Sequence, residues 1–335
     1  MRSIFQAQLV NDATGDPGVY VDFRSRRRAL LIDLGDNTVL PARRLLRLSH
    51  VFVSHTHMDH FIGFDRLVRT CVGRHAGLHL FGPPGFVGQI ERRLSAYTWD
   101  RTDRYEIEFV ITATELDSLY TTRSARFRAG SAFVREPLAP GHIEDGVLLD
   151  EPGFKVRCAV LDHRTPCLGF AVEEKTRVSV RTDVLAWLDL RVGPWVADLK
   201  RAALEGTSDD TRLRAWWRES GGVCEKTLAM GELKRALEFV PGQKICYVTD
   251  VVFHEANVDR IVRLACDADQ LFIESVFLDA DAIHAREKQH LTAREAGSIA
   301  RLAGVRNVVP FHFSPRYTGR TDALRAELEA AFRGG

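Results

Sequence analysis

The sequence predicts a layered α/β fold with one inserted segment. Two observations carry this prediction: short apolar runs typical of buried strands recur along the chain, and amphipathic helical patterns separate them. The length of 335 residues suits one main domain, spanning 1–335, with an insertion. The apolar fraction of 45% and the charged fraction of 27% are ordinary for a globular protein, which excludes a disordered chain.

The predicted strands follow one another with a shared feature at their ends. A hairpin over 18–33, with a basic turn, opens the fold. Each of five later runs delivers a polar residue that is able to bind a metal. These runs are 51–54 before His55, 158–162 before His163, 245–249 before Asp250, 271–273 before Glu274, and 308–311 before His312. Because ligand sites in layered α/β proteins gather where strands end, the pattern predicts one common site.

Helical patterns alternate with these strands, and one long segment interrupts the alternation. The predicted helices cover 61–72, 86–97, 255–265, 292–303 and 321–332. Residues 178–240 contain no good strand and several short helical pieces, with charges of both signs. We therefore predict an inserted helical arm at about 178–240, with exposed tryptophans at Trp195, Trp216 and Trp217.

Composition also limits the compartment and the partners. The N-terminus lacks a signal-peptide pattern and no apolar stretch approaches a membrane span, so a cytoplasmic protein without membrane contact is expected. The six cysteines form no close pair and are interpreted as buried packing residues. Cys158 and Cys167 flank His163 and are weaker alternatives as ligands. With a net charge of +1, any nucleic-acid affinity must come from a local patch.

The most informative segment places four possible metal ligands within six residues, namely His55, His57, Asp59 and His60. Imidazole and carboxylate together suit zinc, although Mn²⁺ or Fe²⁺ also accept them. His55 and His57 are two residues apart, so on an extended chain both rings point to the same side. Asp59 and His60 are expected in a tight turn before a helix at Phe61, facing a second metal. The segment therefore predicts two metal ions, with zinc favoured.

This H-x-H-x-D-H motif after an apolar strand resembles the signature of the metallo-β-lactamase superfamily, whose fold is an αββα sandwich. The downstream motifs resemble those of ribonuclease Z, the endonuclease that trims tRNA 3′ ends. The matching segments are Leu161-Asp-His-Arg-Thr-Pro-Cys-Leu-Gly-Phe170, Tyr247-Val-Thr-Asp250, Ile273-Glu-Ser-Val-Phe277, His290-Leu-Thr-Ala293 and His312-Phe-Ser-Pro-Arg-Tyr317. Residues 190–200 resemble the Gly-Pro-containing part of the arm with which that family grips tRNA.

The resemblance implies separate roles for these residues, as metal ligands or as catalytic groups. One metal would be held by His55, His57 and His163, the other by Asp59, His60 and His312, and Asp250 would bridge the two. Asp59 would also orient the attacking hydroxide. His290, paired with Glu274, would protonate the leaving oxygen or stabilise the phosphate, a task that suits a histidine because its pKa lies near working pH. The implied partners are precursor tRNA and a second copy of the chain in a homodimer.

Three functions remain open at this point. The first is RNA 3′ processing, and the second is hydrolysis of small phosphodiesters such as cyclic nucleotides, which would not need the arm. The third is a non-catalytic scaffold with a structural metal. Asp59, Asp250 and His290 argue against the third, because a structural zinc needs four closed ligands and no additional acid. His142 and His254 are interpreted as surface or structural residues.

Overall fold

The computed structural model describes residues 4–24, 26–117, 120–219 and 221–334. Ser25, in the predicted basic turn, lies outside the described residues. The chain divides into two compact units: unit 1 combines Met1–Glu173 with Gln243–Gly335, and unit 2 is Glu174–Gly242.

The larger sheet of unit 1 has nine strands in the described part of the chain, in the order β1-β2-β3-β4-β5-β6-β7-β8, with β9 paired to β7. The strands are β1 (Phe5–Leu9), β2 (Val19–Phe23), β3 (Ala29–Ile32), β4 (Leu48–Phe52), β5 (Gly77–Gly82), β6 (Val110–Leu116), β7 (Thr121–Arg128), β8 (Arg135–Pro137) and β9 (Gly141–His142). Neighbours from β3 to β6 are parallel, and the flanking pairs are antiparallel.

The second sheet has the order β10-β11-β12-β17-β18-β19. Its strands are β10 (Val147–Glu151), β11 (Phe154–Asp162), β12 (Pro166–Glu174), β17 (Lys244–Val248), β18 (Gln270–Glu274) and β19 (Val308–Phe311). The last three strands are parallel to one another, so their carboxyl ends lie at the same edge of the sheet. That edge is where the predicted ligands after each strand are expected to meet.

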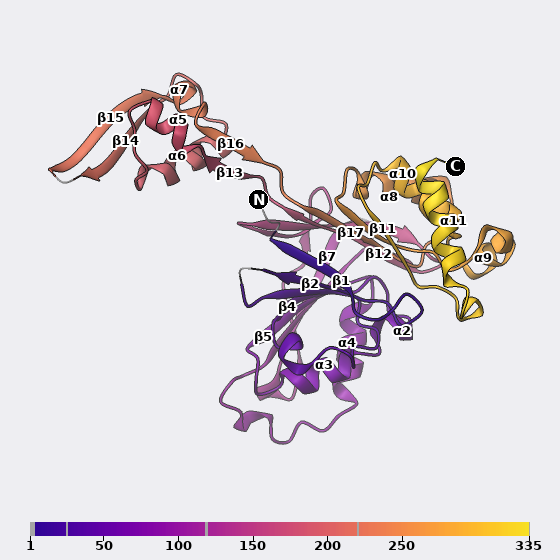
Figure 1. Ribbon diagram of the computed structural model, residues 1–335. Helices are drawn as coiled ribbons and strands as arrows, with labels where there is room; N and C mark the ends of the chain where they lie inside the picture. The colour runs from indigo at the N-terminus through magenta and orange to yellow at the C-terminus, as the bar shows by residue number, and fades with distance from the viewer. Residues whose placement is uncertain (1–3, 25, 118–119, 220, 335) are drawn as a thin grey trace. The chain divides into compact units, whose positions relative to one another are not determined.

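Helices cover the outer face of each sheet (Figure 1). Those of unit 1 are α1 (Ala42–Leu45), α2 (Met58–Phe61), α3 (Phe64–Cys71), α4 (Phe86–Ser95), α8 (Glu255–Ala265), α9 (Ala282–Lys288), α10 (Ala293–Leu302) and α11 (Thr321–Arg333), with short 3₁₀ helices at Thr102–Arg104, Ala129–Ser131, Asp279–Asp281 and Pro315–Tyr317. One apolar core lies between the sheets, and another lies under the helices of each outer layer. This arrangement confirms the predicted αββα sandwich.

Two details of unit 1 differ from the prediction. The hairpin of β2 and β3 does not open the fold, because β1 precedes it and pairs with β2. Asp59 and His60 do not precede a helix but lie inside the short helix α2. The helix begins earlier because His57 is already extended at φ −60° and ψ 156°, so the chain turns directly after it. Among the described residues, no helix combines the length and apolar character needed to cross a membrane.

Unit 2 is not purely helical, which corrects the predicted helical arm. It contains α5 (Thr182–Trp187), α6 (Trp195–Leu204) and α7 (Met230–Lys234), and also β13 (Arg177–Val180), β14 (Arg212–Glu219), β15 (Gly222–Ala229) and β16 (Leu237–Val240). β14 and β15 form a hairpin, and β13 pairs with β16. Trp195 is buried at 2% exposure, contrary to the prediction, because it packs in the apolar core of unit 2. Trp216 and Trp217 are only half-buried.

Candidate metal centre

The carboxyl ends of β17, β18 and β19 deliver three of the predicted residues to one place. Asp250 and His312 follow their strands by one or two residues, and Glu274 is the last residue of β18. Asp250 has φ +46° and His312 has φ +60°, a left-handed conformation that bends the chain sharply after the strand. Such conformations are uncommon outside glycine but are tolerated by Asp and His, and they recur at functional sites.

The H-x-H-x-D-H segment approaches the same place from the other sheet. It follows β4, and Asp59 lies in the first turn of α2, where the helix dipole favours a negative charge. Gly35 makes this approach possible, since a Cβ at that position would lie 2.5 Å from the Asp59 carbonyl oxygen. A side chain there would push α2 away from the site.

Asp250 lies between two sets of histidines and points one oxygen at each. Its Oδ2 atom lies 3.5 Å from His55 Nε2 and 3.3 Å from His163 Nε2. Its Oδ1 atom lies 3.4 Å from His60 Nε2 and 3.0 Å from His312 Nδ1. Asp59 lies on the second side only, with Oδ2 3.4 Å from His60 Nε2 and 3.3 Å from His312 Nε2. A carboxylate divided in this way can bind two cations at once.

These atoms belong to three overlapping groups that could each hold a metal ion. In each group, the possible ligand atoms all lie within 4.8 Å of one another. The first group is His55, His57, His163 and Asp250, and the second is Asp59, His60 and His312. The third group, Asp250, Glu274, His290 and His312, shares Asp250 with the first and His312 with the second. The structure thus brings together all seven residues that the sequence suggested as ligands.

The chemistry of the donor atoms fits a metal. His55 Nε2, His60 Nε2 and His312 Nδ1 are buried and have no hydrogen-bond partner in the described residues. Unpartnered buried polar atoms are costly, and a metal ion bound between these three nitrogens and the carboxylate that they face would satisfy all of them. Burial, together with the nearby His60, lowers the pKa of His55 to about 3, which keeps its imidazole neutral as metal binding requires.

His290 and Glu274 form a pair beside this centre. His290 Nδ1 lies 2.9 Å from Glu274 Oε2, so Nδ1 donates and Nε2 is left for another partner. Glu274 Oε1 accepts hydrogen bonds from the backbone amides of Val251 and Leu291. Burial raises the pKa of Glu274, but the ion pair with His290 outweighs this effect and brings the pKa to about 2. Glu274 is therefore an ionised anchor that fixes the orientation of His290.

Comparisons with known proteins place the chain in a family. No family model matches it. The curated ribonuclease Z of Deinococcus radiodurans is 30% identical over 333 residues, which cover 98% of this chain and 95% of that protein. The chain belongs to the ribonuclease Z family.

Solved structures agree on the fold. The short form of human tRNase Z has a TM-score of 0.53 at 20% identity, with 93% of each chain covered. The metallo-β-lactamase-fold protein YhfI of Bacillus subtilis has a TM-score of 0.55 at 15% identity, with 98% of this chain and 94% of that chain covered. At these identities the likeness concerns the fold alone, and it supports the αββα architecture of this ribonuclease Z family member.

Sequence reasoning missed one residue of the centre, Asp33. Its buried carboxylate accepts hydrogen bonds from the Ser54 amide at 2.6 Å, the Ser54 hydroxyl at 2.8 Å and the Tyr247 hydroxyl at 2.7 Å. It also lies 2.8 Å from His60 Nδ1, so it orients that ring and leaves Nε2 toward Asp250. The signal was present, since Asp33 ends an apolar strand as Asp250 does, but its partners lie far away in the sequence.

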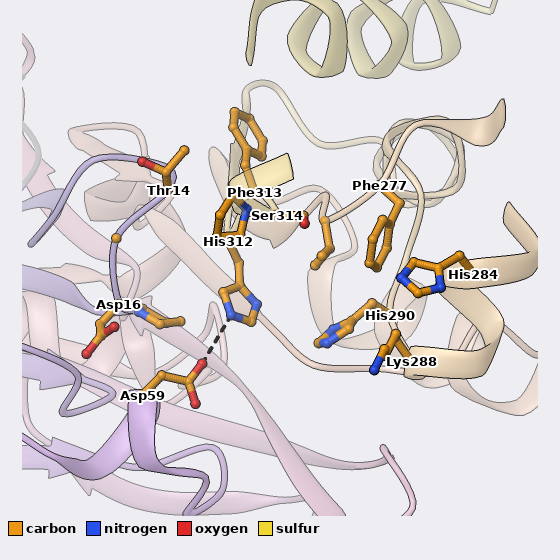
Figure 2. A pocket seen from close by; sticks show the side chains of 14 residues that line it. Thr14, Asp16, Asp59, Phe277, His284, Lys288, His290, His312, Phe313 and Ser314 are labelled. Atoms are coloured by element: carbon orange, nitrogen blue, oxygen red, sulfur yellow. Dashed lines mark hydrogen bonds and ion pairs between the residues drawn. The ribbon is translucent and has the colours of Figure 1, made fainter. Parts of the chain in front are cut away.

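A cavity of about 400 Å³ opens beside the second group of ligands (Figure 2). Asp59, His290 and His312 line it together with Phe277, His284 and Lys288. The loop of Thr14 to Pro17 forms another part of its wall. Substrate atoms in this cavity would lie beside both the metal ligands and His290.

The other histidines and cysteines considered as possible ligands lie outside the metal groups or are buried packing residues. His142 is exposed in β9. His254 precedes α8, and its Nδ1 atom accepts a hydrogen bond from the Asn257 amide. Cys158 is buried, and the buried Cys167 donates to the Thr249 carbonyl oxygen at 3.3 Å. Neither cysteine belongs to a potential metal group among the described residues.

Proposed function

We propose that this chain is a metal-dependent endoribonuclease that processes the 3′ ends of precursor tRNA, with two Zn²⁺ ions as cofactors. The observation that carries the proposal is the division of the Asp250 oxygens between two ligand groups, beside the His290–Glu274 pair. The relationship to ribonuclease Z supports RNA as the substrate class.

The proposed ligands are His55, His57 and His163 on one side and Asp59, His60 and His312 on the other, with Asp250 between them. Zinc is favoured because it accepts imidazole nitrogen and carboxylate oxygen, although Mn²⁺ or Fe²⁺ would also fit. Two such ions would activate a water and offset the charge of a phosphodiester.

The protein's own groups would complete the reaction. His290 lines the cavity, and its Nδ1 atom is held by Glu274, so Nε2 can give a proton to the leaving oxygen. Its pKa is suited to that role: burial lowers the pKa, but the charge of Glu274 outweighs burial and raises it above the ordinary value. Asp59, in the first turn of α2, would bind metal and orient the attacking water.

Unit 2 is proposed to bind the body of the RNA, because a folded RNA is recognised by shape and phosphate contacts away from the cleaved bond. Its Gly193-Pro194 segment resembles the tRNA-gripping arm of the family. A homodimer, implied by the same resemblance, stays a prediction that sedimentation analysis can test.

The decisive assay compares a precursor tRNA with bis-p-nitrophenyl phosphate as substrates of the purified, metal-loaded protein. We expect both to be hydrolysed, with cleavage of the precursor at the 3′ end of the tRNA body. Hydrolysis of the small ester alone would favour a phosphodiesterase for small substrates. Hydrolysis of neither would contradict the proposed function.

A further inference from the structure

Three cavities are lined by ligands of the metal centre, and two of them share a further lining residue. The first, of about 400 Å³, is lined by Asp59 and His312 of the second group. The second, of about 340 Å³, is lined by His57 and His163 of the first group. Both cavities are also lined by one other residue, Lys288, at the end of α9. The centre thus has a hollow on either side, and one cation borders both.

Lys288 is available for a ligand. Its side chain is exposed, and within the described ranges it makes no hydrogen bond or ion pair. Figure 2 shows it on the wall of the first cavity with His284 and His290. His284 is already engaged, with Nδ1 3.6 Å from Glu287. The Lys288 ammonium is therefore free to bind an anion that enters either cavity.

The charges around Lys288 make it important for an anionic substrate. Asp16 and Asp59 line the first cavity, and Glu287 lines the second. Asp59 is a proposed metal ligand, but Asp16 and Glu287 would repel a phosphate. Arg164 adds a second cation to the second cavity only. The positive charge of Lys288 can therefore offset the repulsion by these carboxylates when a polyanion extends from one cavity into the other.

We propose that Lys288 binds a non-scissile phosphate next to the cleaved bond, so that an RNA strand occupies both cavities with its scissile phosphate over the metal centre. This inference rests on the proposed function, because it assigns a path to the RNA. The nucleoside that leaves occupies the first cavity, since His290, the proposed proton donor, lines that cavity. Lys288 is a specificity residue for substrates with more than one phosphate, and it takes no part in the proton transfer.

The first test removes the positive charge of Lys288. Lys288→Ala should lower kcat/KM for a short RNA about 5- to 20-fold, near the lower end of the loss for a hydrogen bond to a charged group because Lys288 is exposed, and Lys288→Arg should restore most of it. The loss on RNA should exceed the loss on bis-p-nitrophenyl phosphate, which has a single phosphate. Arg286→Ala is the matched control, because Arg286 is an exposed cation on the same helix and lines neither cavity.

A neutral methylphosphonate linkage placed beside the scissile phosphate identifies the contact. At one of the two flanking positions it should slow the wild-type protein about 5- to 20-fold but slow Lys288→Ala less than about twofold. Equal losses in both proteins at both positions would overturn the inference. Equal losses of RNA cleavage in Lys288→Ala and Arg286→Ala would also overturn the inference, because the effect would then come from the overall positive charge of the surface and not from one contact.

A second measurement keeps the inference separate from RNA cleavage itself. A nucleoside 3′,5′-bisphosphate should inhibit hydrolysis of bis-p-nitrophenyl phosphate, and Lys288→Ala should raise its inhibition constant about 5- to 20-fold. An unchanged constant would contradict the role of Lys288. If the wild-type protein hydrolyses the ester but cleaves no RNA, the proposed function fails, while a raised inhibition constant would still support the Lys288 phosphate site.

Discussion

The metal centre in unit 1 and the inserted unit 2 use charged residues in opposite ways. In the centre two carboxylates are buried, with 3% side-chain exposure for Asp250 and 0% for Glu274, while Asp59 at the cavity is 42% exposed. In unit 2 most ion pairs are exposed, as in Arg214–Glu225, where the side chains are 64% and 56% exposed. Exposed pairs contribute only about 0–1 kcal/mol, whereas a buried charge requires a complete set of partners.

Function should depend on single side chains in the metal centre and on a broader surface in unit 2. Removal of one buried partner in the centre leaves other charged groups without compensation, so the effects there should be large and specific. Unit 2 has its own small core, which includes Trp195, Leu199 and Met230, and most of its ion pairs face solvent. Changes in unit 2 should therefore affect the binding of large substrates and leave the chemistry intact.

The largest effect that sharpens this comparison is expected at His290. His290→Ala should lower turnover on RNA by about 10²- to 10⁴-fold, because a positioned proton donor is lost, while the metal content stays the same. The loss should be smaller for p-nitrophenyl esters, since their leaving group needs little protonation. Steady-state kinetics and elemental analysis of the same preparation check this. A lost metal ion would show that His290 is a ligand and not an acid.

Deletion of unit 2 should produce a loss that depends on the substrate. A Cβ at Gly242 would lie 1.8 Å from the Glu174 carbonyl oxygen, so the two chain ends of the unit meet and a short Gly-Ser linker can replace 176–240. Because β12 and β17 remain paired, unit 1 should fold. We expect roughly 10²-fold weaker cleavage of precursor tRNA, from lost phosphate contacts, and little change on the small ester. Equal losses on both substrates would contradict a separable unit.

A smaller effect is expected at Asp33, which contacts the centre only through His60. Asp33→Asn should weaken metal binding about 10- to 100-fold, the usual range for a residue that orients a ligand. Competition with a chelator measures this. Tyr247→Phe is the matched control, since it removes one donor to Asp33 without a contact to His60. Equal weakening in both variants would mean that the whole hydrogen-bond network, and not the orientation of His60, matters.

The smallest effect is expected at Cys167, whose sulfur lies 3.9 Å from His55 Nδ1. We expect Cys167→Ala to retain all bound metal and to lose only roughly 1 kcal/mol of unfolding free energy, as for a small buried side chain. Metal analysis and chemical denaturation check the two parts. A loss of metal in this variant would mean that Cys167 is a metal ligand after all.

The sequence predicted the centre better than it predicted unit 2, for a physical reason. Strand-end residues such as His55 and Asp250 follow buried apolar runs, and a buried run is a strong local signal. In β14, Arg212 to Glu219 places only Ala215 in a fully buried position, so the alternation that marks a strand is weak. Such a hairpin depends on cross-strand pairing that local sequence does not reveal.

Asp33 and Trp195 illustrate the same limit. The partners of Asp33 include Tyr247, which is 214 residues away in the sequence, so no local pattern could connect them. Trp195 is buried because α6 packs against the other elements of unit 2, and its indole nitrogen donates to the Arg191 carbonyl oxygen. These contacts join residues from several elements of unit 2, so the sequence around Trp195 does not reveal them.

If Asp250 joins two metal sites into one centre, metal analysis of the wild-type protein beside Asp250→Ala should reveal it. The wild-type protein should bind about two metal ions per chain. The variant should lose affinity at both sites together, because two cations without the carboxylate between them repel each other. Wild-type protein with one metal ion or none after metal-replete purification, or a variant that loses only one of two ions, would contradict the account.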